Sequence, residues 1–320
     1  MQQIVVEDND KGKRIANFLI SLFPKLTIGM IYKFSRQNMI KVNKKRVDPN
    51  YRLCLKDTIF LFIPENFLFE KENKLNFLKA SKELSVVYED ENIILINKPI
   101  GLLCQEDKNT KIEVLSNQLL HYLFFKKEWD YKKENSFVPA LINRIDRNTS
   151  GIVIAAKNAE SLKILNEKMT LHEIKKFYLT KVHGIVSPKH AILKDYLQKD
   201  EQTNTVKIFK NKINNFSQEI ITEYQVLSID KEKDYSILEV QLHTGRTHQI
   251  RAHLSFYGYP LFGEKKYISS NKKYHDDKKY QSLISYKVLF KFTNDAGILN
   301  YLNNKIFSIS SDIQNLLSLL

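Results

Sequence analysis

The segment LINRIDRNTSG, residues 141 to 151, places one carboxylate between two arginines. Asp146 lies between Arg144 and Arg147, and apolar runs precede and follow the segment. A turn held by buried strand is rigid, as a catalytic group requires. Nearby guanidinium groups favour the ionised carboxylate, which suits a nucleophile or an electrostatic stabiliser better than a general acid. Taken alone, an aspartate in such a turn is more commonly a turn former or a helix cap.

A second group of polar residues lies in HTGRTHQIRAHLSFYGYPLFGEKKY, residues 243 to 267. The pattern predicts a helix over 247–257 that Thr247 caps and Gly258 ends. Arg246 would then stand at the amino end of this helix, where free backbone N–H groups attract anions. Arg246 could hold a phosphate or orient a carboxylate there, and the alternative is an ordinary surface arginine.

A third stretch, KKFYLTKVHG at residues 175 to 184, alternates as a strand does. The alternation places Lys176, Tyr178 and Thr180 on one face. Tyr178 would stack on a flat substrate such as a base if it is functional, and otherwise it packs within the sheet.

Several familiar kinds of site are missing from the sequence. Nine glycines in 320 residues form no phosphate-binding loop, which argues against nucleotide hydrolysis and hydride transfer. The five-residue spacing of His243, His248 and His253 prevents convergence on one metal, so we interpret them as hydrogen-bonding or core residues. Cys54 and Cys104 have no ligand spacing and are interpreted as core residues. We therefore predict no metal site and no cofactor.

Composition indicates a folded protein with an anionic partner. Fifty Lys and Arg against 36 Asp and Glu leave a net charge of +14, which favours a polyanion such as nucleic acid or an anionic membrane surface. The amino terminus has acids where a signal peptide has bases, and no apolar run approaches the roughly 20 residues of a membrane span. We expect a cytoplasmic protein with no membrane association.

Positive charge is concentrated in residues 1–64, which hold twelve Lys or Arg and five Asp or Glu, a net of +7. The sequence predicts one helix that Asp10 caps and a second that Thr27 caps, followed by a hairpin around Asn43-Lys44. This clustering raises the odds of phosphate binding over a merely solvated charged face. The candidate RNA-binding side chains are Lys33, Arg36, Lys41, Lys44, Lys45 and Arg46.

A linker is predicted over 65–84, followed by a second domain over 85–320. Strands there outnumber helices and are mostly consecutive, which predicts an α+β fold with a mixed, largely antiparallel sheet. Strands are expected at 85–88, 93–96, 152–156, 177–182, 220–227, 236–243, 285–292 and 306–309. Helices are expected at 159–169, within 111–125, at 247–257 and after Ser311, and 269–281 is expected to be a loop.

The order of these motifs resembles the RluA-type pseudouridine synthases. INKPIGLL, NRIDRNTSGIVIAAK, KFYLTKVHG and HTGRTHQIRAHL follow one another as in that family. The segment IYKFSRQNMIKVNKKRVDPNYRL resembles an alpha-L RNA-binding domain, in which the second helix and the hairpin face RNA. The chain is most similar to members that carry this domain and act on large-subunit ribosomal RNA.

The resemblance implies roles for individual residues. Asp146 matches the catalytic aspartate, Tyr178 the tyrosine that contacts the flipped uracil, and Arg246 the arginine paired with the carboxylate. Arg144 matches the arginine that helps displace the base. Asn143 stands where the family usually has histidine, which removes no essential catalytic group.

The reaction that the resemblance implies is the isomerisation of specific uridines to pseudouridine in 23S ribosomal RNA, by a monomer. Transfer RNA is kept as a second substrate class. The reaction leaves the composition of the RNA unchanged, so it demands no oxidant, metal or energy source. Two alternatives remain at this point: a non-catalytic RNA-binding or ribosome-assembly protein, and a nucleoside glycosidase with Asp146 as nucleophile.

Overall fold

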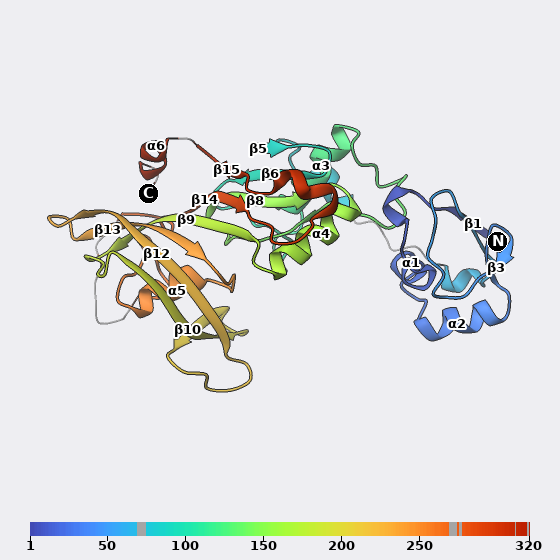
Figure 1. Ribbon diagram of the computed structural model, residues 1–320, viewed down its shortest axis with the longest axis horizontal. Helices are drawn as coiled ribbons and strands as arrows, with labels where there is room; N and C mark the ends of the chain where they lie inside the picture. Colours follow the sequence, from blue (N-terminus) through green and yellow to red (C-terminus); the bar gives the residue numbers. More distant parts are fainter. Residues whose placement is uncertain (69–74, 269–273, 275–276, 311, 319) are drawn as a thin grey trace.

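The computed structural model describes residues 1–68, 75–268, 274, 277–310, 312–318 and 320. These residues form two sheets in an elongated molecule, with the first 63 residues at one end (Figure 1). The larger sheet and its helices make up the rest. The fold is of the predicted α+β class with a mostly antiparallel large sheet.

The N-terminal unit is a four-stranded sheet with two helices and its own apolar core. The strand order is β1-β4-β2-β3, and Phe18, Ile31 and Ile59 are among the fully buried core residues. Its elements are β1 (Gln2–Val5), α1 (Ile15–Leu22), α2 (Ile28–Arg36), β2 (Ile40–Val42), β3 (Lys45–Arg46) and β4 (Thr58–Leu61).

The cap predictions in this unit have different outcomes. Thr27 caps α2 as predicted, because its hydroxyl accepts a hydrogen bond from the N–H of Met30. The prediction for Asp10 is wrong: α1 begins after Arg14 without a side-chain cap. The carboxylate of Asp10 is instead buried and accepts hydrogen bonds from Asn135 and Ser136, more than 120 residues away.

Eleven strands form the large sheet. Nine follow the order β11-β10-β12-β13-β9-β14-β8-β6-β5, with β15 paired to β14 and β7 to β8. All pairs are antiparallel except that of β14 with β8. The strands are β5 (Val86–Glu89), β6 (Ile93–Lys98), β7 (Ala140–Leu141), β8 (Ser150–Ala156), β9 (Ile174–His183), β10 (His190–Asp200), β11 (Thr205–Phe209), β12 (Gln218–Asp230), β13 (Tyr235–Leu242), β14 (Leu283–Phe290) and β15 (Ile306–Ser308).

Helices cover both faces of this sheet. They are α3 (Leu115–Phe125), α4 (Ala159–Thr170), α5 (Gln249–Phe256) and α6 (Ile313–Leu317). Alternate residues of β6 and β8 pack against α3 and α4 on opposite faces. Farther along the sheet, α5 packs on the face that carries Tyr178, whereas α6 packs on the face that carries Leu179. The central strands are therefore buried on both sides.

The predicted strands all exist, with ends shifted by a few residues. The hairpin strands β10 and β11 were missed, as were β1, β4 and the two-residue β7. The last helix is capped by Asp312, whose side chain accepts from the N–H of Gln314. The predicted cap Ser311 and most of the predicted loop 269–281 lie outside the described residues.

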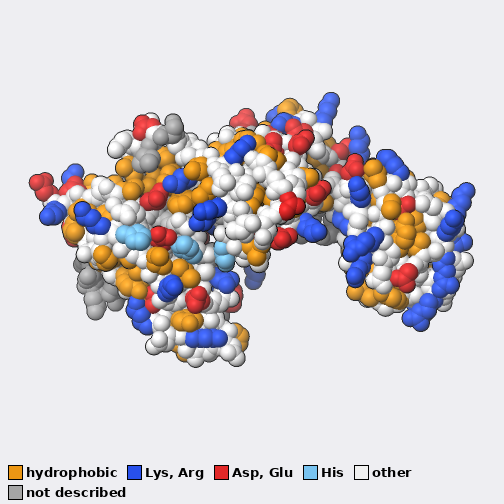
Figure 2. All heavy atoms as spheres, in the orientation of Figure 1, with side chains coloured by type: hydrophobic (Ala, Val, Ile, Leu, Met, Phe, Trp, Pro, Cys, Tyr) orange, Lys and Arg blue, Asp and Glu red, His pale blue; other side chains and the backbone are white. Residues whose placement is uncertain are grey.

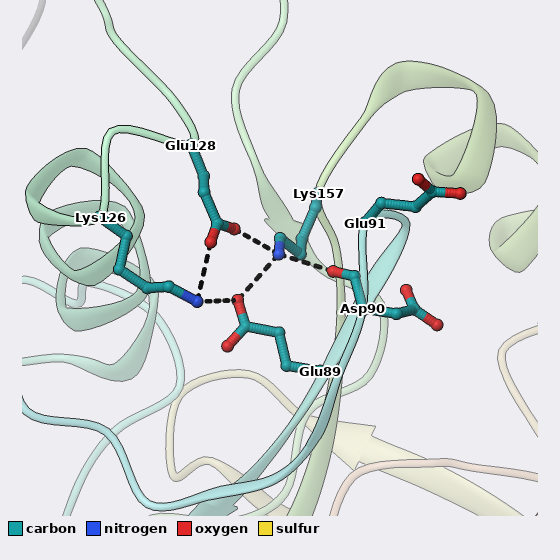
Figure 3. A pocket seen from close by; sticks show the side chains of 6 residues that line it. All are labelled: Glu89, Asp90, Glu91, Lys126, Glu128 and Lys157. Atoms are coloured by element: carbon teal, nitrogen blue, oxygen red, sulfur yellow. Dashed lines mark hydrogen bonds and ion pairs between the residues drawn. The ribbon is translucent and has the colours of Figure 1, made fainter.

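A network of ion pairs fastens α3 to the strand ends (Figure 3). Lys157, directly after β8, contacts Glu89 at 2.8 Å and also pairs with Glu128. Lys126 reaches Glu89 at 3.0 Å and Glu128 at 2.8 Å. These four groups, together with Asp90 and Glu91, line a hollow of about 460 Å³. Within the network the two lysines neutralise Glu89 and Glu128. We interpret the network as structural.

Polar contacts join the N-terminal unit to the large one. The side chain of Asn9 accepts a hydrogen bond at 2.9 Å from the N–H of Ala159, the first residue of α4. Lys13 donates to Ser136, and Asn135 donates to the carbonyl of Val5 at 2.8 Å. None of the helices in the described ranges is long and apolar enough to cross a bilayer.

Gly151 meets a steric constraint at the start of β8. Its φ is +111°, and a Cβ atom there would lie 2.1 Å from the carbonyl oxygen of Ser285 on β14. The parallel pairing of β8 with β14 includes this residue. Only glycine permits the close approach of these two strands.

We expect Gly151→Ala to destabilise the protein by about 3 kcal/mol or more, because both the backbone conformation and the contact with Ser285 are incompatible with a side chain. The midpoint of urea unfolding measures this. The matched control is Gly245→Ala, since a Cβ atom there meets nothing within 4 Å. Equal midpoints for the two variants would refute the steric argument.

Candidate active site

Asp146 lies in the connection between β7 and β8, which is docked on the segment after β6. The N–H of Gly101 donates to the carbonyl of Arg147 at 2.8 Å, and the Nε of Arg147 donates back to the carbonyl of Gly101 at 2.9 Å. The thiol of Cys104 lies 3.4 Å from the carbonyl oxygen of Ile145. The loop of Asp146 is thus held by a second loop rather than projecting freely.

A buried lysine fixes this junction. The Nζ of Lys98, at the end of β6, donates to the carbonyls of Pro99, Leu102 and Arg147 at 2.8, 2.7 and 3.1 Å. Burial lowers the pKa of Lys98 to about 8, and the neighbouring Cys104 and Asp146 act in the opposite direction. The ammonium group donates all three of its protons to backbone carbonyls and so holds the loop of Asp146 against the end of β6.

The carboxylate of Asp146 is paired with Arg251 on α5. The Nη1 of Arg251 lies 2.9 Å from Oδ2 of Asp146. The same guanidinium donates to both carboxylate oxygens of Glu264, at 2.7 and 2.8 Å. Burial alone would raise the pKa of Glu264, but the hydrogen bonds and charge of Arg251 lower it. Arg251 therefore bridges a fully buried carboxylate and one whose side chain is 25% exposed.

The predicted partner of Asp146 was wrong. Arg246 is exposed, and within the described part of the chain the arginine that contacts Asp146 is Arg251. The predicted cap was also wrong: α5 begins at Gln249, after His248 in a left-handed conformation with φ of 52° and no side-chain cap. Arg246 consequently lies in the turn before the helix, whereas Arg251 lies on it.

His248 lies near Asp146 on the other side. Its Nε2 is 3.8 Å from Oδ2 of Asp146, and its Nδ1 is 2.6 Å from the hydroxyl of Tyr267. Burial lowers the pKa of His248, although the charge of Asp146 opposes this. The imidazole is therefore neutral at pH 7 and leaves Arg251 as the cation that contacts Asp146.

Tyr178 lies on β9, and its side chain faces α5. It is 5% exposed and belongs to the core cluster that contains Ile250 and Leu254. Burial raises the pKa of Tyr178, so the phenol is neutral at physiological pH. The predicted strand face is confirmed, because Val182 belongs to the same cluster and Leu179 to the cluster on the opposite face.

One cavity of about 1080 Å³ brings the predicted residues together. Asp146, Tyr178, Arg144 and Arg246 all line it. Its basic lining residues are Arg144, Arg147, Lys176, Lys199, Arg246, Arg251 and Lys266, and its acids are Glu106, Asp107 and Asp146. The cavity thus surrounds one central carboxylate with an excess of cations.

The three histidines of the motif have separate partners. His243 pairs with Glu223 at 2.7 Å, His248 with Tyr267, and His253 with Asp195 at 2.9 Å. The prediction that they are hydrogen-bonding residues is confirmed. The described residues hold no group of three metal-ligating side chains. The core prediction is right for Cys104, which is buried, and wrong for Cys54, which is exposed.

Three functional candidates were missed from the sequence: Lys98, Arg251 and Glu264. Lys98 carried a signal, since strand alternation places it on the same face as the apolar residues Ile94 and Ile96. Arg251 also carried one, because it lies directly after Ile250 on a helix whose apolar residues face the core. Nothing local marks Glu264, whose partner is 13 residues away.

Comparison with known proteins shows which proteins this chain resembles. The family model described as RNA pseudouridylate synthase matches residues 92–256. An uncharacterized RNA pseudouridine synthase of Mycoplasma genitalium is 34% identical over 290 residues, which are 90% of this chain and 88% of that protein. A protein of Buchnera aphidicola named ribosomal large subunit pseudouridine synthase C is 31% identical, over 92% of this chain and 94% of that protein.

A solved structure has the same fold. Human RNA pseudouridylate synthase domain containing 4 aligns with a TM-score of 0.52 at 20% identity, over 64% of this chain and 84% of that one.

We expect Arg251→Met to cost about 3–5 kcal/mol of unfolding free energy, because it leaves Glu264 buried and unpaired. The double variant Arg251→Met/Glu264→Gln should recover most of this loss. The glutamine keeps the oxygen that accepts from the N–H groups of Lys265 and Lys266. Denaturant titration of the single and double variants measures the coupling.

Lowering the pH provides an independent check. The folded pKa of Glu264 lies below its ordinary 4.5, so its contribution is fully present above pH 4.5 and is lost as the pH falls through the folded pKa. The stability difference between wild type and Arg251→Met should therefore narrow in acid. A difference that does not change with pH would contradict the ion-pair account.

Proposed function

The chain belongs to the RNA pseudouridylate synthase family, and we propose that it isomerises specific uridines of large-subunit ribosomal RNA with Asp146 as the catalytic group. The activity class, an isomerase that forms pseudouridine in RNA, follows from the family. The observation that carries the assignment of Asp146 is its ion pair with the buried Arg251 inside a basic cavity.

The reaction exchanges one bond to the ribose for another. The bond from nitrogen 1 of uracil to carbon 1′ breaks, the base turns, and carbon 5 bonds to the same carbon. The hydrogen on carbon 5 is lost to water, and nitrogen 1 gains a proton, so composition is unchanged. Two routes fit Asp146: attack on carbon 1′, or removal of the proton on carbon 2′ to form a glycal.

The surroundings of Asp146 suit both routes. Arg251 holds an ionised carboxylate in one orientation, because the buried pair with Glu264 prevents the guanidinium from turning away. Lys98 fixes the loop from the other side through the carbonyl of Arg147. The carboxylate is preorganised and still 25% exposed to the cavity in which the ribose would lie.

Two further residues fit the handling of the base. Removing a uridine from its stack costs a few kcal/mol of free energy. Protein contacts with the extruded base, and a side chain that fills the space it leaves, must offset this cost. Arg144 is exposed at the edge of the cavity, with its guanidinium 3.4 Å from the side-chain oxygen of Gln105. We propose that Arg144 fills the space that the extruded base leaves in the RNA stack. We propose that Tyr178, on the cavity wall, contacts the uracil.

Similar proteins support ribosomal RNA as the substrate. Relatives in Buchnera aphidicola and Rickettsia bellii are named ribosomal large subunit pseudouridine synthase C. The proposed place of action is accordingly the cytoplasm. Every group invoked in the reaction lies in one chain, which favours a monomer as the acting form. Transfer RNA remains the second substrate to test.

The N-terminal unit fits an RNA-binding role of the alpha-L type. Lys and Arg side chains are spread over its surface (Figure 2). Lys33 and Arg36 on α2 are exposed, as are Lys44, Lys45 and Arg46 on the hairpin, whereas Lys41 is half-buried. The buried Asp57 supports the hairpin by accepting from the side chain of Asn43 at 2.7 Å. We propose that this basic surface holds RNA while the cavity binds the target uridine.

Family membership weighs against the two alternatives. A non-catalytic assembly protein would not need a carboxylate held by a buried arginine, and a glycosidase acting on nucleosides would not need the basic N-terminal surface.

We expect Asp146→Asn to reduce turnover by more than about 10³-fold, because a neutral amide can neither attack the ribose nor remove its proton. RNA binding should persist. The assay is tritium release from large-subunit ribosomal RNA carrying tritium at carbon 5 of uridine. The matched control is Asp107→Asn, the same substitution at an exposed residue of the same cavity.

Full activity of Asp146→Asn would defeat the catalytic assignment. Release from transfer RNA and not from ribosomal RNA would overturn the substrate assignment and leave the chemistry intact. Free uracil as the product would indicate the glycosidase.

We expect Lys45→Gln/Arg46→Gln to weaken RNA binding and to lower the slope of log affinity against log salt by about 0.7 for each contact to a single strand. The control is Lys231→Gln/Lys233→Gln, which removes the same charge from the exposed turn between β12 and β13. Affinity titrations over a series of salt concentrations compare the two. Equal salt slopes for the two double variants would show that the hairpin does not contact the RNA.

A further inference from the structure

Lys176 is a buried cation that the proposed mechanism does not use. It lies on β9, in the centre of the large sheet (Figure 1), and its side chain points to the same face as Tyr178. The residue is 9% exposed and lines the cavity. Among the described residues, the acceptor that its Nζ contacts is the sulfur of Met169, at 3.9 Å.

This arrangement is costly for a protein that binds nothing there. A buried ammonium normally has a carboxylate or several carbonyl oxygens, as Lys98 has. Burial lowers the pKa of Lys176 to about 8, so the group is still mostly protonated at pH 7. A thioether is a weak acceptor and does not satisfy three N–H donors.

The acids of the cavity are engaged elsewhere. Asp146 pairs with Arg251. Glu106 accepts hydrogen bonds from Asn76 and Asn117, and Asp107 accepts from the N–H groups of its own turn. The carboxylates that line the cavity therefore leave Lys176 unpaired.

The neighbouring wall is positive as well. Arg246 from the turn before α5 lines the same cavity. Burial lowers the pKa of His172, in the turn after α4, and the charges of Lys176 and Arg246 lower it further, so both cations act on one neutral imidazole. Arg246 is exposed, and it too lacks a carboxylate partner among the described residues. Lysine and arginine that converge without an acid form the usual donor set for phosphate.

We propose that Lys176 and Arg246 bind a backbone phosphate of the RNA strand next to the extruded uridine. The inference rests on the proposed RNA substrate and deepens it, because it identifies the group that enters this part of the cavity. Lys176 is two residues from Tyr178 on one strand face. A phosphate held there would place the adjoining ribose and base between Lys176 and the Asp146–Arg251 pair.

The first test separates a binding role from a structural one. Lys176→Met removes the charge and keeps an unbranched side chain that is one atom shorter. The variant should therefore melt at the same or a higher temperature, while its affinity for RNA falls about 10- to 100-fold. Lys175→Met is the matched control, since Lys175 is the preceding residue on the same strand and points to the other face. Lys176→Arg should restore part of the affinity.

The second test identifies the group bound. If Lys176 contacts a phosphate, Lys176→Met should lower the slope of log affinity against log salt by about 0.7 relative to Lys175→Met. A contact to a uracil carbonyl would lower affinity without changing the slope, and that result would overturn the proposal.

A third test locates the phosphate. Single methylphosphonate replacements, which remove one charge each, are made along an RNA fragment around the modified uridine. At one position the replacement should weaken binding to wild type and have no further effect on Lys176→Met. Equal losses for both proteins at every position would overturn the proposal.

The proposed function and this inference can fail separately. If wild type forms no pseudouridine in any RNA, the proposed function fails. If wild type is active but Lys176→Met matches Lys175→Met in affinity, salt slope and methylphosphonate profile, the phosphate site fails and the proposed function stands.

Discussion

Neutralisation of the buried Arg251 guanidinium is the constraint on which the active site depends. An arginine removed from water needs partners for its charge and for its five N–H donors. Glu264 supplies both of its carboxylate oxygens, and Asp146 supplies a third acceptor. These residues come from α5, the segment after it and the β7–β8 loop. A shift of any of the three would leave a charge unpaired in the interior, so one interaction sets the relative positions of three segments.

Lys98 is a second buried cation that needs acceptors, and it lies on the other side of the loop. Its ammonium is bound by three carbonyls, one of them that of Arg147. The loop of Asp146 is therefore held between two buried cations, one that contacts the carboxylate and one that contacts the backbone. Gly151 completes the arrangement by allowing β8 to approach β14 directly after the loop. The rigidity of the site comes from the sheet, since β6, β8 and β14 are each buried on both faces.

The charged residues of the cavity divide into cations that can bind an anion and one carboxylate that can act on the sugar. The acidic groups of the cavity are paired or lie in local turns, whereas Lys176 and Arg246 remain available to an anion. A cavity of this kind attracts a polyanion through long-range electrostatics and still presents one ionised carboxylate to the sugar. The N-terminal unit adds exposed cations on a separate scaffold. Polar contacts join the two units, and such contacts give a defined orientation with less rigidity than an apolar interface.

The sequence by itself determined the local features. Apolar periodicity predicted eight of the eleven strands of the large sheet and its four helices. Thr27 before an apolar helical pattern predicted a cap, and alternation placed Lys176 and Tyr178 on one face. The position of Asp146 beside a buried strand was also readable from the residues. Tertiary structure alone decided the partners. Arg246 and Arg251 belong to one motif, and only the start of α5 at Gln249 and the burial of Glu264 select Arg251. Asp10 resembles a helix cap but pairs with residues about 125 positions away. The local pattern of residues sets secondary-structure propensity and the face on which a side chain lies. The partners of a buried charge are instead the groups that the complete fold brings within hydrogen-bond distance.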